Sequence, residues 1–407
     1  MYRTLLSEDK MKLAPIIKQN FKGYAAAPIK NIYLQNNTQE SQKNIFNELK
    51  EVGKKEGFGV QIEQDGKLYQ DINDAEPSER YMWAQDNKII VNKDGKRQVL
   101  VSGVKPDFES ELGKALDVET TDAQSVFEGG NVYIGKKPDG ENYLIVGQDV
   151  VFEMAAAKFI DAKLTRASKM SDVKPFKMMF QMPGGYATMT EGGDKVSFEV
   201  DETEILEEQA KEQLSKDFNV KKENICIVPQ LEFHIDMFLR PLDYPYILIN
   251  DKNMADMVAS EFGIKNQGEK DPLDMLDMMF PFAKEDKYAT TIQKLKDCGF
   301  KPISVAGVFG DSGQVNYMNS FVNQAPDGSL SYIAMSSKDA DKKFKELDSV
   351  FDNELKSKAP NIKNVYHISG GKSEENKDLN NIMANIYYRQ GGLHCLGCEE
   401  PDFEKWG

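Results

Sequence analysis

The sequence has no run of about 18 apolar residues, and the segment from Met1 to Leu13 contains no apolar stretch of signal-peptide length. We therefore expect neither a membrane-spanning helix nor a standard export signal. The 407 residues include only four cysteines: Cys226, Cys298, Cys395 and Cys398. Four cysteines are too few for a disulfide framework in a chain this long. These absences predict a reducing, cytoplasmic setting, with export by a dedicated secretion system left open.

Positive charge is also scarce, because 51 Lys and Arg face 66 Asp and Glu and give a formal net charge of -15. Nucleic-acid binding depends on cations that neutralise phosphates, so nucleic acid is not an expected partner. An acidic surface attracts cationic ligands, but net acidity also keeps proteins soluble. With 40% hydrophobic and 29% charged residues, the chain is too apolar to be disordered. The prediction is a folded globular protein without a membrane partner.

Helical patterns alternate along the chain with short runs of β-branched and aromatic residues. Apolar residues three or four apart predict five helices, at about Glu40 to Gly53, Glu109 to Leu116, Glu204 to Asp217, Lys287 to Cys298 and Asp339 to Ser357. Short runs bounded by Gly, Pro, Asn or Asp predict strands at 59–62, 88–91, 99–102, 131–134, 143–146, 225–228, 246–249, 302–305, 331–335 and 365–368. The series predicts mixed α/β structure with several small sheets, in five helix-then-strand units.

Two segments have the character of insertions into these units. Residues 161–203 contain Pro183-Gly184-Gly185 and Gly192-Gly193 between β-like runs, which predicts hairpins over a surface. Residues 251–284 are rich in Met and Asp. This second segment predicts a lid or a partner contact, with a buried helix as the alternative.

A cysteine close to a glycine pair is the sharpest local signal. Gly391 and Gly392 shortly precede Cys395, and glycine lets a substrate approach closely because it has no side chain. Taken alone, the Cys395-x-x-Cys398 spacing also suits a redox pair, half of a zinc site or two buried structural cysteines. The sequence has no second cysteine pair of this spacing to complete a zinc site.

Three further elements carry groups that could share a pocket with this cysteine. His234 and Asp236 would lie on the same face if the run around them were a strand. The other candidates are Trp83 and Asp86, and Glu128 and Asn131 on either side of a Gly-Gly pair. Each element alone has low specificity.

In this order along the chain, the elements resemble motifs of the guanidine-modifying superfamily of pentein fold: Trp-x-x-Asp, Glu-Gly-Gly, His-x-Asp, a Tyr-x-Asn-Phe-like element and Gly-x-His-Cys. That superfamily includes agmatine and arginine deiminases, dimethylarginine hydrolases, arginine amidinotransferases and protein-arginine deiminases. The resemblance runs from about Ile29 to the C-terminus. It implies one catalytic pentein domain over residues 1–407, a five-bladed propeller of ββαβ units with the site on its pseudo-fivefold axis.

The resemblance also implies what these residues do. Cys395 would attack the guanidinium carbon, while Asp86 and Asp236 grip the planar, forked guanidinium. His234 would protonate the departing ammonia and then activate water to release a ureido product. The remaining candidates would contact or support the substrate: Trp83, Glu128, Asn131 and Asn319.

No redox cofactor and no metal are required by this chemistry. Calcium stays open because the animal protein-arginine deiminases require it, although the chain has no EF-hand-like loop. Among the residues left over, His394 is expected to support the cysteine loop, Cys398 to be a bystander thiol and His367 to be structural.

Peptidyl or protein arginine is the predicted substrate, with citrulline and ammonia as products. Agmatine and free-arginine enzymes usually carry Arg where this chain has Gln85, and the ending from Phe403 to Trp406 resembles the tail of the protein-arginine deiminases. Leu396 to Cys398 depart from the family pattern after the nucleophile. Agmatine, free arginine, methylarginine or transfer of the amidino group therefore remain alternatives, and a catalytically silent binding pentein is an alternative of another class. Oligomeric state is not predicted.

Overall fold

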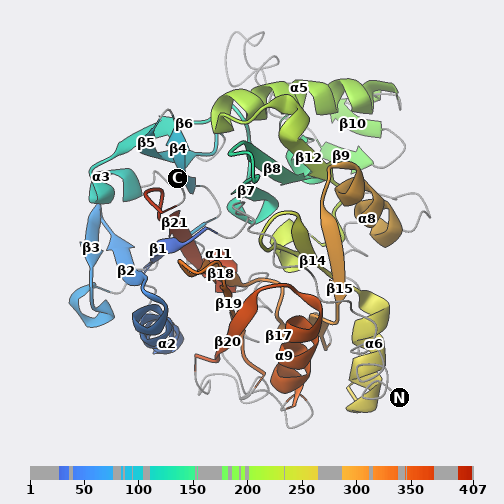
Figure 1. Cartoon of the computed structure of the whole chain (residues 1–407). Helices are drawn as coiled ribbons and strands as arrows, with labels where there is room; N and C mark the ends of the chain where they lie inside the picture. Colours follow the sequence, from blue (N-terminus) through green and yellow to red (C-terminus); the bar gives the residue numbers. More distant parts are fainter. Residues whose placement is uncertain are drawn as a thin grey trace.

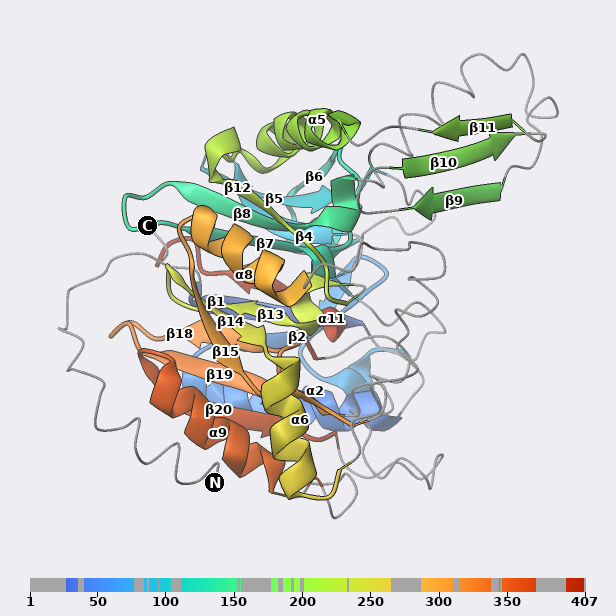
Figure 2. The ribbon, with the colours of Figure 1, turned by 90° about the vertical axis from the view of Figure 1, so that its right-hand side faces the viewer.

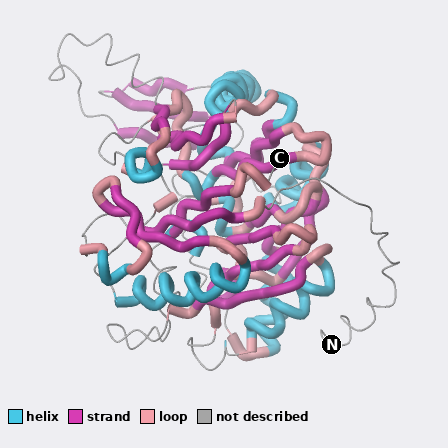
Figure 3. Tube along the Cα trace, turned by 60° about the vertical axis from the view of Figure 1, so that its left-hand side comes forward, coloured by secondary structure: helices cyan, strands magenta, loops and turns pink. Residues whose placement is uncertain are grey.

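The computed structural model describes residues 27–35, 40–76, 84–85, 88–93, 95–103, 111–151, 154, 177–181, 186–191, 194–197, 201–232, 234–264, 287–310, 315–337, 344, 346–370 and 393–405. Within these ranges the chain is mixed α/β and its strands form several small sheets, which confirms the predicted fold class. Figure 3 shows strands in the interior and helices toward the periphery. No helix in the described ranges is both long enough and apolar enough to cross a membrane.

Five of the sheets formed by the described residues repeat one pairing pattern. In each, two antiparallel strands are joined by a third strand that runs parallel to the second. The five sets are β21 (Gly397–Pro401), β1 (Ile29–Gln35) and β2 (Gly59–Gln64); β4 (Lys88–Lys93), β5 (Lys96–Val101) and β6 (Glu119–Asp122); β7 (Val132–Lys136), β8 (Asn142–Gly147) and β12 (Ile225–Val228); β13 (Leu239–Pro241), β14 (Tyr246–Asn250) and β15 (Lys301–Val305); and β18 (Phe321–Gln324), β19 (Leu330–Met335) and β20 (Ile362–Ile368). Figure 1 shows these sheets around a common centre.

A helix connects the second strand to the third in each set, as parallel pairing requires. These helices are α2 (Glu40–Glu56), α3 (Leu112–Leu116), α5 (Asp201–Phe218), α8 (Lys287–Asp297) with α6 (Lys252–Glu261) before it, and α9 (Leu347–Lys358). They lie on the outer side of the sheets, so the inner ends of the strands meet at the centre (Figure 1).

The remaining elements are short. An antiparallel sheet of β9 (Lys177–Gln181), β10 (Tyr186–Glu191) and β11 (Asp194–Ser197) lies in the segment predicted to form hairpins. Figure 2 shows this sheet standing apart from the others. The other short elements are β3 (Lys67–Tyr69), β16 (Val308–Phe309), β17 (Val315–Asn316), α11 (Leu393–Leu396) and the 3-10 helices η1 (Ile72–Asp74), η3 (Gly129–Asn131), η5 (Lys222–Asn224) and η6 (Ile235–Met237).

The central strands are buried on both faces, which explains their continuous apolar runs. All residues of β19 are buried, and so are those of β8 from Tyr143 to Gly147. Phe46 of α2 and Phe351 of α9 have no exposed surface. Because burying a side chain of this size contributes about 1.5–3 kcal/mol, the apolar faces of the helices hold them against the sheets.

Four predicted helices, those that became α2, α3, α5 and α8, lie close to their predicted positions. The helix predicted from Asp339 is α9, which begins at Leu347, and residues 338–343 and 345 lie outside the described residues.

Strand β21 was missed because its sequence, GCEEP, has no apolar alternation; its Glu400 is buried through an ion pair with Arg97. Of the Met- and Asp-rich segment 251–284, the structure describes α6 and its ends, where Val258 is buried. Residues 265–284 lie outside the described part.

A disulfide bond joins Cys226 of β12 to Cys298 at the end of α8, with 5.9 Å between their Cα atoms. Disulfides persist in oxidising compartments and are rare in the cytosol. The cysteine count did not predict this bond, because a count does not tell which cysteines the fold brings together across 72 residues.

We expect alkylation of the unfolded, unreduced chain to label Cys395 and Cys398 and to spare Cys226 and Cys298, and prior reduction to expose all four thiols to mass spectrometry. Closing a loop of 72 residues stabilises a fold by about 4 kcal/mol in the chain-entropy account. The Cys226→Ser/Cys298→Ser variant should accordingly unfold at lower denaturant concentration. Labelling of four thiols without reductant would contradict the bond.

His367 of β20 joins this strand to α9 and is structural, as predicted. Its Nε2 lies 2.7 Å from Oδ1 of Asp352 and its Nδ1 lies 3.0 Å from the carbonyl oxygen of Met335. Burial acts to lower the pKa of His367, but the hydrogen bond to Asp352 and the charge of Asp348 outweigh burial, so the pKa is raised above its ordinary value. Protonated His367 therefore stabilises the packing of α9.

A raised folded-state pKa means that this stabilisation is complete below the unfolded pKa of about 6.5 and is lost as the pH rises through the folded pKa. We expect His367→Gln to lower the free energy of unfolding by about 1–3 kcal/mol near pH 5.5, and by less near pH 8.5. Urea unfolding of both proteins at the two pH values measures the difference. An equal loss at both would show that the charge of His367 plays no part.

Candidate active site

Cys395 lies at the centre of the molecule because α11 directly precedes β21, the strand that pairs with β1. Its side chain is 2% exposed. The Sγ atom lies 3.2 Å from Nδ2 of Asn319 and 3.4 Å from Oδ2 of Asp236. The sulfur thus faces polar groups, and because the carboxylate of Asp236 disfavours a thiolate, ionisation of Cys395 calls for a cation beside it.

His234 and Asp236 are brought together by a turn and not by a strand. His234 is the N-cap of η6, with φ of -127° and ψ of 148°, and Asp236 lies within this 3-10 helix. The strand prediction was wrong because Ile235 and Met237 are buried along with the polar residues, so the segment has no exposed face to alternate with. The local geometry of this segment is therefore a 3-10 turn and not the predicted strand.

The structure brings Cys395, His234 and Asp236 into one buried cluster. Their Sγ atom, a ring nitrogen and a carboxylate oxygen all lie within 4.8 Å of one another. Thiolate, imidazole and carboxylate are also ligands that a zinc ion accepts, so these three side chains are the ones that could hold a metal. The same three groups can also serve as a nucleophile, an acid–base group and a cation-binding group.

Glu128 and Asn131 hold the segment that carries His234. The carboxylate of Glu128 contacts Nε2 of His234, and Oδ1 of Asn131 accepts a hydrogen bond of 3.0 Å from the backbone N–H of Ile235. The Glu128 side chain is 28% exposed, whereas that of His234 is 7% exposed. Glu128 therefore orients the imidazole from the more open side of the cluster, and Asn131 fixes the turn.

The Gly-Gly pair between these residues is required by close packing. A Cβ atom on Gly130 would lie 2.4 Å from Nδ1 of His234 and 3.1 Å from Oδ1 of Asp236. A Cβ atom on Gly129 would lie 2.1 Å from the carbonyl oxygen of Gln85. Only glycine lets the backbone pass this close to the imidazole and the carboxylate.

Asn319 fixes the position of the cysteine. Its Oδ1 accepts hydrogen bonds from the backbone N–H groups of His394, at 2.6 Å, and Cys395, at 3.3 Å. Its Nδ2 points to Sγ of Cys395. Asn316 in turn accepts from the backbone N–H of Asn319 at 3.2 Å. The amide predicted to support the site thus contacts the sulfur of Cys395 directly.

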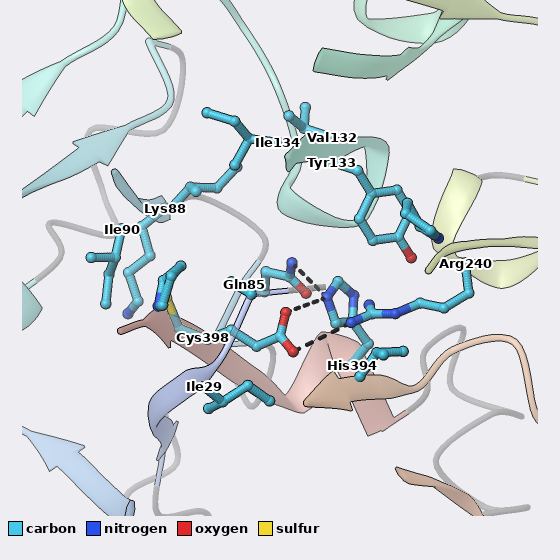
Figure 4. Close-up of a pocket in the computed structure, with 16 residues that line it drawn as sticks. Ile29, Gln85, Lys88, Ile90, Val132, Tyr133, Ile134, Arg240, His394 and Cys398 are labelled. Atoms are coloured by element: carbon cyan, nitrogen blue, oxygen red, sulfur yellow. Dashed lines mark hydrogen bonds and ion pairs between the residues drawn. The ribbon is translucent and has the colours of Figure 1, made fainter. Parts of the chain in front are cut away.

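His394 lines a cavity of about 80 Å³ and also contacts Asp236 of the cluster (Figure 4 shows His394 at the cavity). Its Nδ1 lies 3.0 Å from Oδ2 of Asp236, whereas its Nε2 lies 3.2 Å from Nε2 of Gln85 and 3.5 Å from Oε2 of Glu399. Nη2 of Arg240 donates to Oε1 of Glu399 at 3.3 Å. Gln85, Arg240, His394 and Glu399 all line the cavity.

Sequence reasoning missed Arg240 and Glu399 as members of this centre. The signal was weak but present: Arg240 is one charged residue in an otherwise apolar run, and such a residue is rarely buried unless it is paired. Its partner Glu399 lies 159 positions away, so the pairing could not be read from the chain.

Two predicted substrate-binding residues, Asp86 and Trp83, lie outside the described residues. Cys398 packs in an apolar cluster with Tyr33 and Ile90. Burial raises the pKa of Cys398 to about 12, so its thiol stays protonated. Cys395 and Cys398 form no disulfide bond, and their different surroundings speak against the redox-pair interpretation.

Neither a family model nor a curated protein sequence matches the chain. Among solved structures, agmatine deiminase from C. jejuni is similar over 95% of this chain and 99% of its own, with 15% identity and a TM-score of 0.48. The arginine dihydrolase ArgZ from Cyanobacteria is similar over 92% of this chain and 40% of its own, with 11% identity and a TM-score of 0.38. DDAH from Pseudomonas aeruginosa, in complex with citrulline, is similar over 92% of this chain and 100% of its own, with 9% identity and a TM-score of 0.38.

All three structures are less than 25% identical to the chain and have TM-scores below 0.5, so the activity of the chain is argued from the residues of the cluster.

Proposed function

We propose that this chain hydrolyses a guanidinium group through a covalent intermediate on Cys395. One observation carries the proposal: a cysteine sulfur, an imidazole nitrogen and a carboxylate oxygen lie within 4.8 Å of one another in a buried cluster. A nucleophile, a proton carrier and a cation-binding group at this spacing match the three needs of the reaction.

Asp236 is the guanidinium-binding carboxylate in this proposal. Its Oδ2 is engaged by His394 and lies near Sγ of Cys395, whereas its Oδ1 is buried without a hydrogen-bond partner among the described residues. A buried carboxylate oxygen that accepts no hydrogen bond favours a ligand that donates hydrogen bonds and carries positive charge. Asp86 is proposed as the second carboxylate on the strength of its motif alone.

His234 carries the proton in both halves of the cycle. The Cys395 thiolate forms a bond to the guanidinium carbon, and one C–N bond breaks as protonated His234 gives its proton to the departing ammonia. An amidino thioether remains. Neutral His234 then removes a proton from water, the hydroxide attacks the same carbon, the C–S bond breaks, and a ureido product leaves. Glu128 keeps the imidazole oriented throughout.

We propose a closed, five-bladed ββαβ propeller as the finer description of the fold. The repeated strand pairing supports this, as does the pairing of β1 with β21, which joins the two ends of the described chain. The cluster would then lie on the axis, where a blade contributes each element.

We propose peptidyl arginine as the substrate, and small guanidino compounds as the alternative. The support is the resemblance of the Trp83 to Asp86 segment and of the C-terminal tail. The side chain of Gln85, which distinguishes the motif, contacts His394 and Gly129. Its contribution to substrate choice would therefore be made through the packing of the centre.

The first test is turnover of an arginyl peptide, agmatine, free arginine and a methylarginine, measured as ureido product and ammonia. We expect the peptide to be turned over, and Cys395→Ser and His234→Gln to lower the rate at least about a thousandfold. Cys398→Ser is the matched control and should keep the rate. A chelator is expected to leave the rate unchanged, and a calcium titration shows whether that ion is needed.

Product from agmatine or arginine with none from any peptide would overturn the substrate assignment alone. No ureido product from any guanidine would overturn the proposed activity. Loss of activity with chelator, restored by zinc, would favour a metal held by Cys395, His234 and Asp236.

Gly130→Ala tests the close packing around the cluster. The added methyl group must displace His234 or Asp236, and a misplacement of about 1 Å can cost on the order of a hundredfold in rate. Gly140→Ala is the control, because a Cβ atom there meets nothing within 4 Å although its φ of +88° makes alanine strained. We expect Gly140→Ala to lose stability but keep its turnover per folded molecule. Full turnover by Gly130→Ala would contradict the geometry of the site.

A further inference from the structure

We propose that Glu399 and Arg240, acting through His394, are positioning residues for the guanidinium-binding carboxylate of Asp236. The proposal rests on the proposed function, because it concerns how that carboxylate is presented to a cationic substrate. It adds a buried chain of interactions that starts at Asp236 and ends at a guanidinium of the protein itself.

The first step of the chain is that the two carboxylate oxygens of Asp236 have different neighbours. Oδ2 lies 3.0 Å from Nδ1 of His394, and Oδ1 remains on the side of Gly130 and His234. Asp236 has no exposed surface. A carboxylate held by one oxygen can rotate only by breaking that contact, so His394 sets the direction in which Oδ1 points.

The second step fixes His394. Its ring lies between Tyr133, at 5.6 Å between centroids, and Phe321, at 5.7 Å. The backbone N–H of His394 donates to Asn319. Its Nε2 lies 3.5 Å from Oε2 of Glu399. The imidazole is therefore restrained at both nitrogens, with a carboxylate at each end.

The third step fixes Glu399. Its Oε1 accepts from Nη2 of Arg240, and the guanidinium of Arg240 lies 5.3 Å from the centre of the Tyr133 ring. Burial acts to raise the pKa of Glu399, but the charges of Arg240 and His394 outweigh burial, so the pKa is lowered and Glu399 stays ionised. A fully buried carboxylate, that of Asp236, and a partly exposed one, that of Glu399, thus share the imidazole, and Arg240, which is 4% exposed, supplies the compensating positive charge.

Glu399→Gln removes the charge that restrains Nε2 of His394 and keeps nearly the same volume. The loosened imidazole would no longer fix Oδ1 of Asp236. The labelling rate of a cationic reagent that binds through this carboxylate should fall. The labelling rate of a neutral reagent that needs only the sulfur should not change. The two reagents therefore separate a positioning effect from general damage to the site.

The experiment compares the rate of Cys395 labelling by chloroacetamidine, a cationic amidine, with the rate of labelling by neutral iodoacetamide. We expect the ratio of the two rates to fall on the order of tenfold in Glu399→Gln, with iodoacetamide labelling within about twofold of the parent protein. Glu400→Gln is the matched control. Glu400 is the neighbour of Glu399 on β21, is fully buried and pairs with Arg97, so this variant should lose stability without a change in the ratio.

A second pair of variants applies even where Glu399→Gln does not fold. The amide of His394→Asn can replace Nδ1 and keep the hydrogen bond to Asp236, whereas the amide of His394→Gln replaces Nε2. We expect His394→Asn to retain most of the preference for the amidine and His394→Gln to lose it. The reverse order, or an unchanged ratio in all three variants, overturns the positioning role. If the parent protein shows no preference for the amidine at Cys395, the proposed function itself fails.

Discussion

The antiparallel pairing of β1 with β21 determines where the reactive sulfur lies. The register places Tyr33 opposite Cys398 and Leu34 opposite Gly397, and α11 begins only a few residues earlier. The helix α11, which contains Cys395, is thereby held near the centre of the ring of sheets (Figure 1). Because a shift of one residue would exchange the faces of β21, the register also decides which side chains face the centre.

Ion pairs anchor this strand on both of its faces, one with a fully buried carboxylate and one with a partly exposed carboxylate. Glu400 is held by Arg97 and by the hydroxyl of Tyr33, while Glu399 is held by Arg240. Desolvating such groups costs free energy, and removal of one partner leaves a buried charge uncompensated. The arrangement therefore contributes little net stability compared with apolar packing, but it allows only one position for the strand.

Buried polar contacts also hold the residues of the candidate active site in place. Asn319 holds the two backbone N–H groups around the cysteine, and Asn131 holds the turn that carries His234 and Asp236. These amides are satisfied before any substrate arrives. Polar groups that are already oriented need no rearrangement when charge develops in a reaction, which is the main source of electrostatic catalysis.

Much of the fold was accessible from sequence because its helices are amphipathic and its inner strands are continuously apolar. The pattern of Phe344, Leu347, Phe351 and Leu355 indicated a helix, although the start of α9 was placed too early. Strand β21 could not be predicted from the sequence, because its burial depends on partners far away in the chain. Local patterns do not encode such pairings.

The candidate site was predicted as a set of residues but not as a geometry. Motifs named Cys395, His234 and Asp236, and the structure brings these three together. The pattern implied a strand for the segment that is in fact a 3-10 turn, since burial on all sides removes the alternation. Arg240 and Glu399 carried no motif, because a positioning pair is defined by contact and not by spacing along the chain.

The central claim is that Cys395 becomes covalently bonded to the carbon of a guanidinium. Rapid acid quenching of the enzyme during turnover, followed by peptide mass spectrometry, tests this claim most directly. The account predicts an amidino adduct on the peptide that contains Cys395, present only while substrate remains and absent in Cys395→Ser. Continued turnover with no adduct on that cysteine, or an adduct on a different residue, would contradict it.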